Sequence, residues 1–352
     1  MKALSVGTRS VMTVLTVSLL ASCGGGGGAG SGSASAAPAS DSATESAAAI
    51  EPQTIRLPHC CADGSHFDVG AEKFAELVAE KTGGAIEVEV FPGGQLGQEA
   101  EVIQNVQDGT IEVSLVGHDP LAGFAAVTQV LSQPYIFRDR DHAFSVLDGE
   151  IGEEVEGELA AAGLLVLGWG DNGQRVYTTD VHQLKEPADF EGLTFRSPQS
   201  PVNLAITEAL GGVGVAIPYG EVYTALQQGT VDGQENAVIN IYPANLQEVQ
   251  GYMSLTHHLT SFTVLIVNPD WFNSLPAKVQ TAVQEAATEA MEFQRQYSAD
   301  LTEELIGKMR DEGMEIVEPD LEPFRAATAD IHEQFVGDAF SAELYEAIVG
   351  AE

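Results

Sequence analysis

Short apolar strands alternate with amphipathic helices from residue 54 onward, and this order restricts the folds open to the chain. Phe74, Leu77 and Val78 fall on one helical face, and the Gly83-Gly84 pair ends that helix. We expect strands at residues 55–58, 86–91 and 112–116, and helices at residues 71–81 and 99–107. This βαβαβ order predicts a largely parallel sheet with helices on both faces.

A second cycle of the same kind follows in the sequence. We expect strands at residues 164–168, 193–196, 214–217 and 261–267, and a helix at residues 220–228. Apolar residues then recur at helical spacing from residue 276 to residue 313. A helix of about 36 residues would be about 54 Å long, longer than one small domain is wide, so it should brace two lobes. The alternative is a coiled-coil oligomerisation arm, but the heptad is not sustained.

Two α/β lobes joined by several crossing segments would leave a cleft between them. We place the first lobe at residues 53–174 plus 261–299 and the second at residues 175–260 plus 300–348. Strand ends and helix N-termini point into such a cleft and favour anions. Trp169 and Asn172 are expected near its hinge side.

The charge balance limits the partners of the chain. Among 352 residues, 15 Lys and Arg face 52 Asp and Glu, which gives a net charge of −37. That excess leaves too little positive charge to neutralise a row of phosphates, so it excludes a nucleic-acid binder. The acidic residues are spread evenly, which favours a solvated shell over a cation site. Adaptation to a salty habitat is a hypothesis that would explain this shell.

The N-terminus predicts the compartment. Lys2 and Arg9 precede an apolar run, residues 11–21, that is too short to span a bilayer and suits a signal peptide. The run ends in residues 20–23 (LASC), which resemble the lipobox of bacterial lipoproteins. We therefore predict a signal peptide at residues 1–22, lipid attachment at Cys23 and a flexible tether at residues 23–52. An ordinary signal peptide with a chance Cys is the alternative.

Six stretches of the folded part together resemble one known family, the DctP-like extracytoplasmic solute receptors of TRAP transporters. The similarity spans roughly residues 55–336. The stretches, in order, are residues 91–97 (FPGGQLG), 133–137 (QPYIF), 172–175 (NGQR), 190–198 (FEGLTFRSP), 221–229 (EVYTALQQG) and 231–236 (VDGQEN). The resemblance implies an α/β fold with two lobes, of the periplasmic-binding-protein kind, with a long helix bridging both lobes.

The resemblance also implies roles for particular residues. Arg196 matches the arginine that pairs with the ligand carboxylate, and Arg175 the arginine that assists it. Asn236 matches a residue that hydrogen-bonds the ligand, and Tyr219 one that lines the pocket wall. Glu99 is inferred from its relative position. With three more candidates, the predicted ligand-binding set is Arg196, Arg175, Asn236, Tyr219, Glu99, Gln199, His118 and Cys60.

The chemistry of Arg196 supports its predicted role independently. A guanidinium offers a planar fork of donors that meets both oxygens of a carboxylate. Arg196 follows an apolar strand, residues 193–195, in a chain with few basic residues. A structural salt bridge to a nearby acid is the alternative, and the residues alone do not separate the two.

The sequence departs from the family pattern at His59-Cys60-Cys61, with His66 shortly after. Buried thiols that line the pocket are our first interpretation. A strained vicinal disulfide is the second. A metal site lacks standard zinc spacing, so we predict no metal. His118, after the strand at residues 112–116, could face the cleft or lie in a surface loop.

The leading hypothesis is a receptor that captures a small organic acid and needs no cofactor. The resemblance implies that it delivers the ligand to membrane subunits of a TRAP transporter, which use an ion gradient. The membrane would be reached through the lipid anchor. The enzyme alternative uses Cys60 or Cys61 as nucleophile with His59 or His66 as base, but no nucleophile elbow accompanies them. A passive surface lipoprotein or adhesin is the third possibility.

Overall fold

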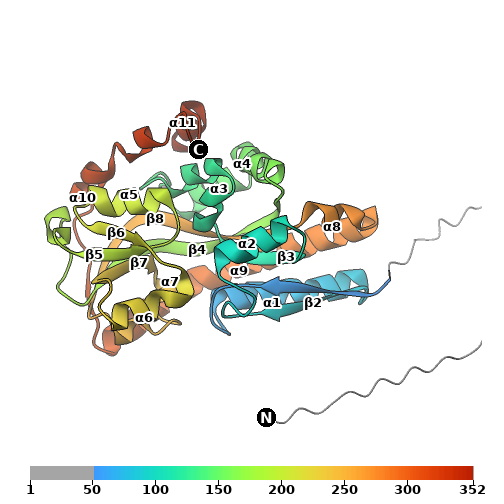
Figure 1. Ribbon diagram of the computed structural model, residues 1–352, viewed down its shortest axis with the longest axis horizontal. Helices are drawn as coiled ribbons and strands as arrows, with labels where there is room; N and C mark the ends of the chain where they lie inside the picture. Colours follow the sequence, from blue (N-terminus) through green and yellow to red (C-terminus); the bar gives the residue numbers. More distant parts are fainter. Residues whose placement is uncertain (1–50, 352) are drawn as a thin grey trace, which may run out of the picture. The chain divides into compact units, whose positions relative to one another are not determined.

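A computed structural model describes residues 51–351 of the chain (Figure 1). The predicted signal peptide, Cys23 and the tether as far as residue 50 lie outside the described residues. The strands are β1 (Gln53–Pro58), β2 (Ile86–Phe91), β3 (Val113–Gly117), β4 (Leu165–Thr179), β5 (Thr194–Ser197), β6 (Val213–Ala216), β7 (Gly233–Ala237), β8 (Tyr252–Val267) and β9 (Glu315–Val317). The α-helices are α1 (His66–Thr82), α2 (Glu99–Gln107), α3 (Arg140–Leu147), α4 (Glu150–Ala161), α5 (Pro201–Ala209), α6 (Val222–Gln227), α7 (Val238–Ile241), α8 (Pro269–Ser274), α9 (Ala277–Asp311), α10 (Glu322–Thr328) and α11 (Ala342–Gly350).

The described part holds one mixed sheet and one small parallel pair. The sheet has the strand order β3-β8-β4-β7-β5-β6, with β9 also paired to β8, while β1 and β2 pair with each other. The predicted largely parallel sheet is therefore wrong. Strands β4 and β8 run antiparallel to each other along most of their length, and β3 and β7 also pair with them in antiparallel fashion. The full lengths of β4 and β8 differ from the prediction because only their apolar ends, residues 164–168 and 261–267, have a sequence pattern typical of strands.

The first βαβ unit packs as its sequence pattern predicts. Ile55 and Leu57 of β1 and Phe74 and Val78 of α1 are buried in one hydrophobic cluster. Helix α1 begins five residues earlier than expected, since Ser65 caps it by accepting a hydrogen bond from the Asp68 amide at 3.3 Å. It ends at Gly83 in the left-handed conformation, as predicted.

The long helix α9 contacts two separate cores. Its 35 residues are about 52 Å long at 1.5 Å per residue. Val283, Ala287 and Ala290 pack with β1 and α1, whereas Leu305 and Met309 pack with α6 and α7. Figure 1 shows α9 passing behind the strands from α8 toward the other end of the molecule. The bridging helix is therefore confirmed, and β4 and β8 cross beside it.

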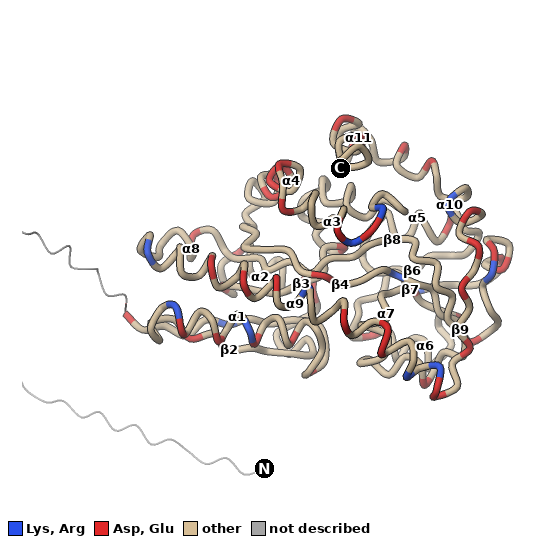
Figure 2. Tube along the Cα trace, turned by 180° about the vertical axis from the view of Figure 1, so that it is seen from behind, with Lys and Arg blue, Asp and Glu red and all other residues tan. Residues whose placement is uncertain are grey.

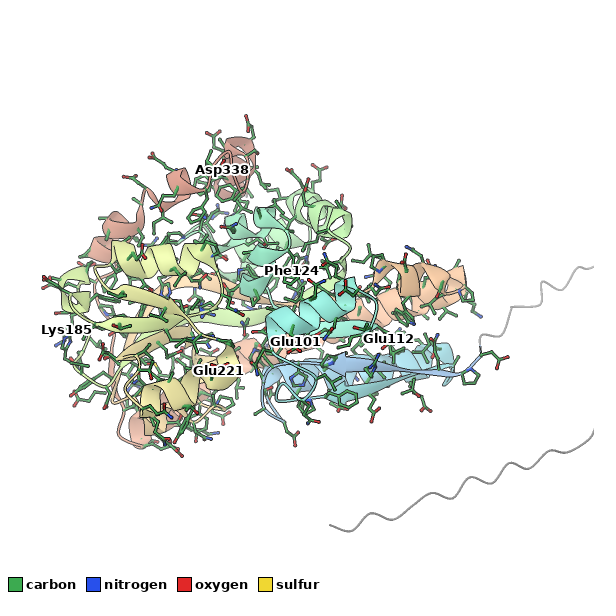
Figure 3. All side chains as sticks on the ribbon, viewed as in Figure 1. Glu101, Glu112, Phe124, Lys185, Glu221 and Asp338 are labelled. Atoms are coloured by element: carbon green, nitrogen blue, oxygen red, sulfur yellow. The ribbon has the colours of Figure 1, made fainter. Side chains whose placement is uncertain are left out.

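Acidic residues are distributed over most elements of the described chain, with few basic residues between them (Figure 2). In Figure 3 the labelled Glu101, Glu221 and Asp338 lie in three different parts of the described chain, and all three are exposed. This spread agrees with a solvated acidic shell. Within residues 51–351, no helix is both long enough and apolar enough to cross a bilayer.

Candidate functional site

A small polar cavity lies where β1, α2, β4, β5 and β7 meet. Fourteen residues line it: Cys60, Cys61, Phe67, Glu99, Gly117, Asp119, Pro120, Asn172, Arg175, Arg196, Pro198, Tyr219, Asn236 and Asn240. Its volume is about 30 Å³. That is room for about two water molecules, so any organic acid would have to separate the walls to enter.

Arg196 is the least compensated charge of this cavity. Strand β5 carries it, and its side chain is almost fully buried. Its Nε donates to the Ile217 carbonyl oxygen at 2.8 Å, but its Nη1 has no hydrogen-bond partner within residues 51–351. Burial and the nearby Arg175 lower its pKa to about 10, so the guanidinium still carries its charge at neutral pH. A buried cation with a free donor has the charge and the hydrogen-bonding group that an anion requires.

Arg175, on β4, is the opposite case. Its guanidinium ion-pairs with Glu235, contacts the Asp119 carboxylate at 3.4 Å and donates to Asn236 Oδ1 at 3.2 Å. Burial would lower the pKa of Arg175, but the Glu235 and Asp119 carboxylates outweigh it and raise the pKa above its usual value. The same ion pair holds the pKa of Glu235 below its usual range against the opposing effect of burial. Arg175 is therefore neutralised by the protein itself.

A bulge in β8 supports this ion pair. The register of β8 against β4 slips between Arg175 and Tyr177, which leaves residues 255–258 as an insertion. The insertion brings His258 Nε2 to 3.4 Å from Glu235. Tyr135 holds the insertion, because its amide donates to the His258 carbonyl oxygen at 3.1 Å and its hydroxyl to that of Thr256 at 3.0 Å. The QPYIF stretch thus acts on the site through the backbone of β8.

Asn236 completes the side of the cavity that we call the arginine wall, formed by Arg175, Arg196 and Asn236. Its Oδ1 accepts from Arg175 and, at 3.0 Å, from Asn240 Nδ2. Its own Nδ2 makes no hydrogen bond among the described residues, which leaves a donor for a ligand.

The facing side, which we call the thiol wall, consists of Cys60, Cys61 and Glu99. Glu99 Oε1 accepts from the Gly117 amide at 2.7 Å, and desolvation raises the pKa of its carboxyl. The two sulfur atoms lie 3.1 Å apart, and Cys61 donates to Asn240 Oδ1 at 3.8 Å. Tyr219 closes this side, and its hydroxyl donates to the Asn240 carbonyl oxygen at 2.8 Å.

The structure brings six of the eight predicted ligand-binding residues together in the cavity: Arg196, Arg175, Asn236, Tyr219, Glu99 and Cys60. Gln199 is exposed and does not line the cavity. His118 is fully buried behind the wall, with Nε2 3.0 Å from Ser132 Oγ and Nδ1 accepting from the Phe262 amide. Both were placed in the cleft because their neighbours in sequence lie there, but their side chains point elsewhere.

The interpretations of the cysteine motif are also tested in part. Cys60 and Cys61 line the cavity as free thiols. His59 Nε2 lies 3.1 Å from Asp68, and His66 Nε2 lies 2.9 Å from Asn172, so the hydrogen bonds of these two nitrogen atoms go to groups other than the thiols. Across the described residues, no group of three or more His, Cys, Asp or Glu side chains has a metal-binding arrangement.

Among the polar side chains of the cavity, sequence reasoning missed Asp119 and Asn240. Asp119 follows the end of β3, where the rule that strand ends face the cleft could have found it. Its Oδ1 is buried and accepts no hydrogen bond within residues 51–351. Asn240 lies on the four-residue helix α7, directly after β7, and nothing in its sequence context marks it. Asn172, expected near the hinge side, does line the cavity, whereas Trp169 is buried elsewhere.

A mixed α/β body with long crossing strands and a buried anion position defines the class of two-lobed solute-binding proteins. The family described as "Bacterial extracellular solute-binding protein, family 7" (DctP) matches residues 58–338. The chain belongs to this family, whose members are extracytoplasmic receptors for solutes.

Named relatives agree with the family. The chain is 33% identical over 298 residues to the 2,3-diketo-L-gulonate-binding periplasmic protein YiaO of Escherichia coli. The matched region covers 84% of this chain and 91% of the relative. A TRAP periplasmic solute-binding protein from Polaromonas sp. JS666, solved with D-erythronate, superposes on this chain with a TM-score of 0.83 and 32% sequence identity. The superposition covers 85% of this chain and 99% of that one. A second such protein, from Roseobacter denitrificans and solved with β-D-glucuronate, has a TM-score of 0.82 and 32% identity, with 85% of this chain and 100% of that one covered.

Proposed function

We propose that this chain is the receptor of a TRAP-type transporter and that it binds a small organic acid through Arg196. The observation that carries the proposal is the unpartnered Nη1 of that buried guanidinium. A ligand carboxylate would supply the missing acceptor and the missing negative charge together. Charge-assisted hydrogen bonds of this kind are about twice as strong as neutral ones.

The preferred ligand is a monocarboxylate that carries hydroxyl groups, such as a sugar acid. Two buried side-chain atoms of the cavity lining make no hydrogen bond among the described residues, Arg196 Nη1 and Asp119 Oδ1. The first requires an anion, and the second requires a donor, which a hydroxyl provides. A second carboxylate on the ligand would instead meet Asp119 and Glu99. The sugar acids named for the relatives above support the same choice.

Binding would proceed by a hinge. The cavity is too small for an organic acid in this conformation, so the walls part for entry and close on the ligand. Strands β4 and β8 and helix α9 connect the two sides and would bend. The lobe boundaries given above, near residues 174 and 261, remain part of this proposal.

The receptor would act outside the cytoplasm, held to the outer face of a membrane through lipidated Cys23 and its tether. The membrane subunits of the transporter would be its protein partners. An enzyme is less well supported, because a hydrogen bond with Cys61 and burial raise the pKa of Cys60, and burial raises that of Cys61. Among the described residues, no side-chain hydrogen bond joins either thiol to a histidine.

A panel of acids in a thermal unfolding assay tests the proposal. D-erythronate, D-glucuronate, succinate and butyrate differ in hydroxyl count and charge. A ligand at 100 times its dissociation constant should stabilise the receptor by about 2.7 kcal/mol, or about 5–10 °C in Tm. We expect the hydroxylated monocarboxylates to produce the shift and to be recovered unchanged. No shift with any acid would reject the receptor assignment, and conversion of an acid would favour the enzyme.

A further inference from the structure

Two adjacent thiols form part of the cavity wall, and the proposed function does not use them. Cys60 and Cys61 follow β1, and their sulfur atoms lie 3.1 Å apart. That is closer than the 3.5–4.0 Å at which even two carbon atoms normally pack, and about 1 Å longer than a disulfide bond. Cys60 is half-buried and Cys61 is buried, so the two differ in access to reagents.

One of the two thiols donates a hydrogen bond that occupies an acceptor of the cavity. Cys61 donates to Asn240 Oδ1 at 3.8 Å, and the Cys60 and Cys61 sulfur atoms are hydrogen-bonded to each other at 3.1 Å. The pKa of each thiol is raised, so both keep their protons at neutral pH. In the reduced protein Asn240 Oδ1 is therefore already engaged by sulfur.

We propose that Cys60 and Cys61 are a reversible modification site, a vicinal dithiol whose oxidation to a disulfide changes the hydrogen bonding that the cavity offers to a ligand. The oxidant is a disulfide compound, such as oxidised glutathione. The Cys60 thiolate attacks its S–S bond and releases one glutathione thiol, and the Cys61 thiolate then attacks Cys60 Sγ and releases the second. The protein loses two protons and two electrons, and the oxidant gains them.

The order of attack follows from burial, because Cys60 is less buried than Cys61 and therefore meets the oxidant first. The Cys61 sulfur atom lies 3.1 Å from that of Cys60 and can then displace the attached glutathione. Adjacent Cα atoms are about 3.8 Å apart, closer than the 4.4–6.8 Å usual for a disulfide, which makes the bond easy to reduce. The compartment of the family is one in which disulfides form and persist. The modification is therefore reversible.

Oxidation would remove both S–H donors from the wall. Asn240 Oδ1, which accepts from Cys61, would become free to accept from a ligand hydroxyl. One such hydrogen bond corresponds to about a 2- to 10-fold change in affinity. This consequence rests on the proposed function, whereas the modification itself does not.

Peptide mapping of the full chain tests the modification. Trypsin releases residues 57–73, which contain Cys60 and Cys61 but not Cys23. After oxidised glutathione and then iodoacetamide under native conditions, this peptide should be unalkylated and two hydrogen atoms lighter than the dithiol. After dithiothreitol it should carry two alkyl groups. A peptide that stays doubly alkylated, or that keeps glutathione, would overturn the proposal.

Two single variants check the assigned order. Cys61→Ser lacks the resolving thiol and should accumulate glutathione on Cys60. Cys60→Ser should remain unmodified, since Cys61 is 2% exposed. Equal glutathione labelling of both variants would contradict the stepwise mechanism.

Calorimetry with D-erythronate and butyrate tests the effect on the cavity, because these acids share four carbons and one charge but differ in hydroxyls. The oxidised protein should bind D-erythronate about 2- to 10-fold more tightly than the reduced protein, and butyrate equally. Equal D-erythronate affinity in both forms would refute the link to the cavity. If neither form binds any acid, the proposed function fails while the peptide mass still decides the modification.

Discussion

The two walls of the cavity differ in how far their charges and hydrogen-bonding groups find partners within the protein. On the arginine wall, Arg175 is neutralised by Glu235 and Asp119, while Arg196 keeps a charge and a donor free. On the thiol wall, the two sulfur atoms contact each other and Glu99 accepts from the Gly117 amide. One wall therefore presents a fixed charge to a ligand, and the other presents groups whose hydrogen bonds can be exchanged.

This difference suggests that one wall anchors the ligand and the other selects among ligands. The arginine wall is formed by residues of the stretches that carry the resemblance to the family, so we expect it to bind the ligand carboxylate. The thiol wall carries the Cys60-Cys61 pair, which that resemblance does not include. We expect changes in the first wall to affect every ligand and changes in the second to affect the choice among ligands.

The largest effect should follow Glu235→Gln, which removes the anion that compensates buried Arg175. Loss of one partner of a buried ion pair costs about 3–5 kcal/mol of folding free energy. The pKa of Glu235 is lowered in the fold, so the pair stabilises the protein at neutral pH, and this contribution is lost as the pH falls below about 4.5. Urea unfolding between pH 3 and pH 7 should therefore show a flatter pH profile in the variant.

Exposed Glu221→Gln is the matched control for that experiment, because it removes one carboxylate from the surface. It should change the free energy of unfolding by less than about 0.5 kcal/mol at any pH. Equal destabilisation by both substitutions would show that the ion pair on the arginine wall has no special role.

The next effect is on binding. Arg196→Ala should weaken every carboxylate ligand by about 2–5 kcal/mol, or at least 30-fold, since it removes the anchoring charge. The unliganded fold should keep its Tm, because the lost charge is buried and uncompensated. Calorimetry measures the affinity of this variant and of a control, Arg310→Ala, which replaces an exposed arginine at the end of α9. Retained micromolar affinity would remove Arg196 from the site.

A smaller and selective effect is expected at Asp119. Asp119→Ala removes the buried acceptor that we assign to a ligand hydroxyl, at a cost of about 1.5 kcal/mol, or roughly tenfold in affinity. The preference for D-erythronate over butyrate should fall by that factor, while butyrate affinity changes less. Equal losses of affinity for both acids would show that Asp119 acts only by holding Arg175 and not by accepting from a ligand hydroxyl.

The smallest effect concerns the surface and not the walls. If the acidic shell is an adaptation to salt, lowering the ionic strength should reduce Tm by a few degrees, about 1 kcal/mol in a domain of this size. The dissociation constant of a bound acid should change less, because the cavity is shielded from the solvent. A Tm that is independent of salt would reject the adaptation.

Individual elements and residues show which features local sequence patterns predict. The positions of β1, β2, α2 and α9 follow from local periodicity, and the motifs led to Arg175, Arg196 and Asn236. The directions of β4 and β8 did not follow, since pairing between distant strands has no local pattern. Gln199 and His118 show the same limit, because closeness in sequence to a site residue does not fix where a side chain points.

The sequence by itself determined the class of the protein, the long helix, the acidic surface and the residue types of the anchor. These properties depend on composition, periodicity and motif order, which are all local. Only the tertiary structure decided that Arg175 is neutralised and Arg196 is not, and that two sulfur atoms touch at the cavity wall. The reason is physical: the state of a buried charge is set by the atoms that surround it, and around Arg175 those atoms come from distant parts of the chain.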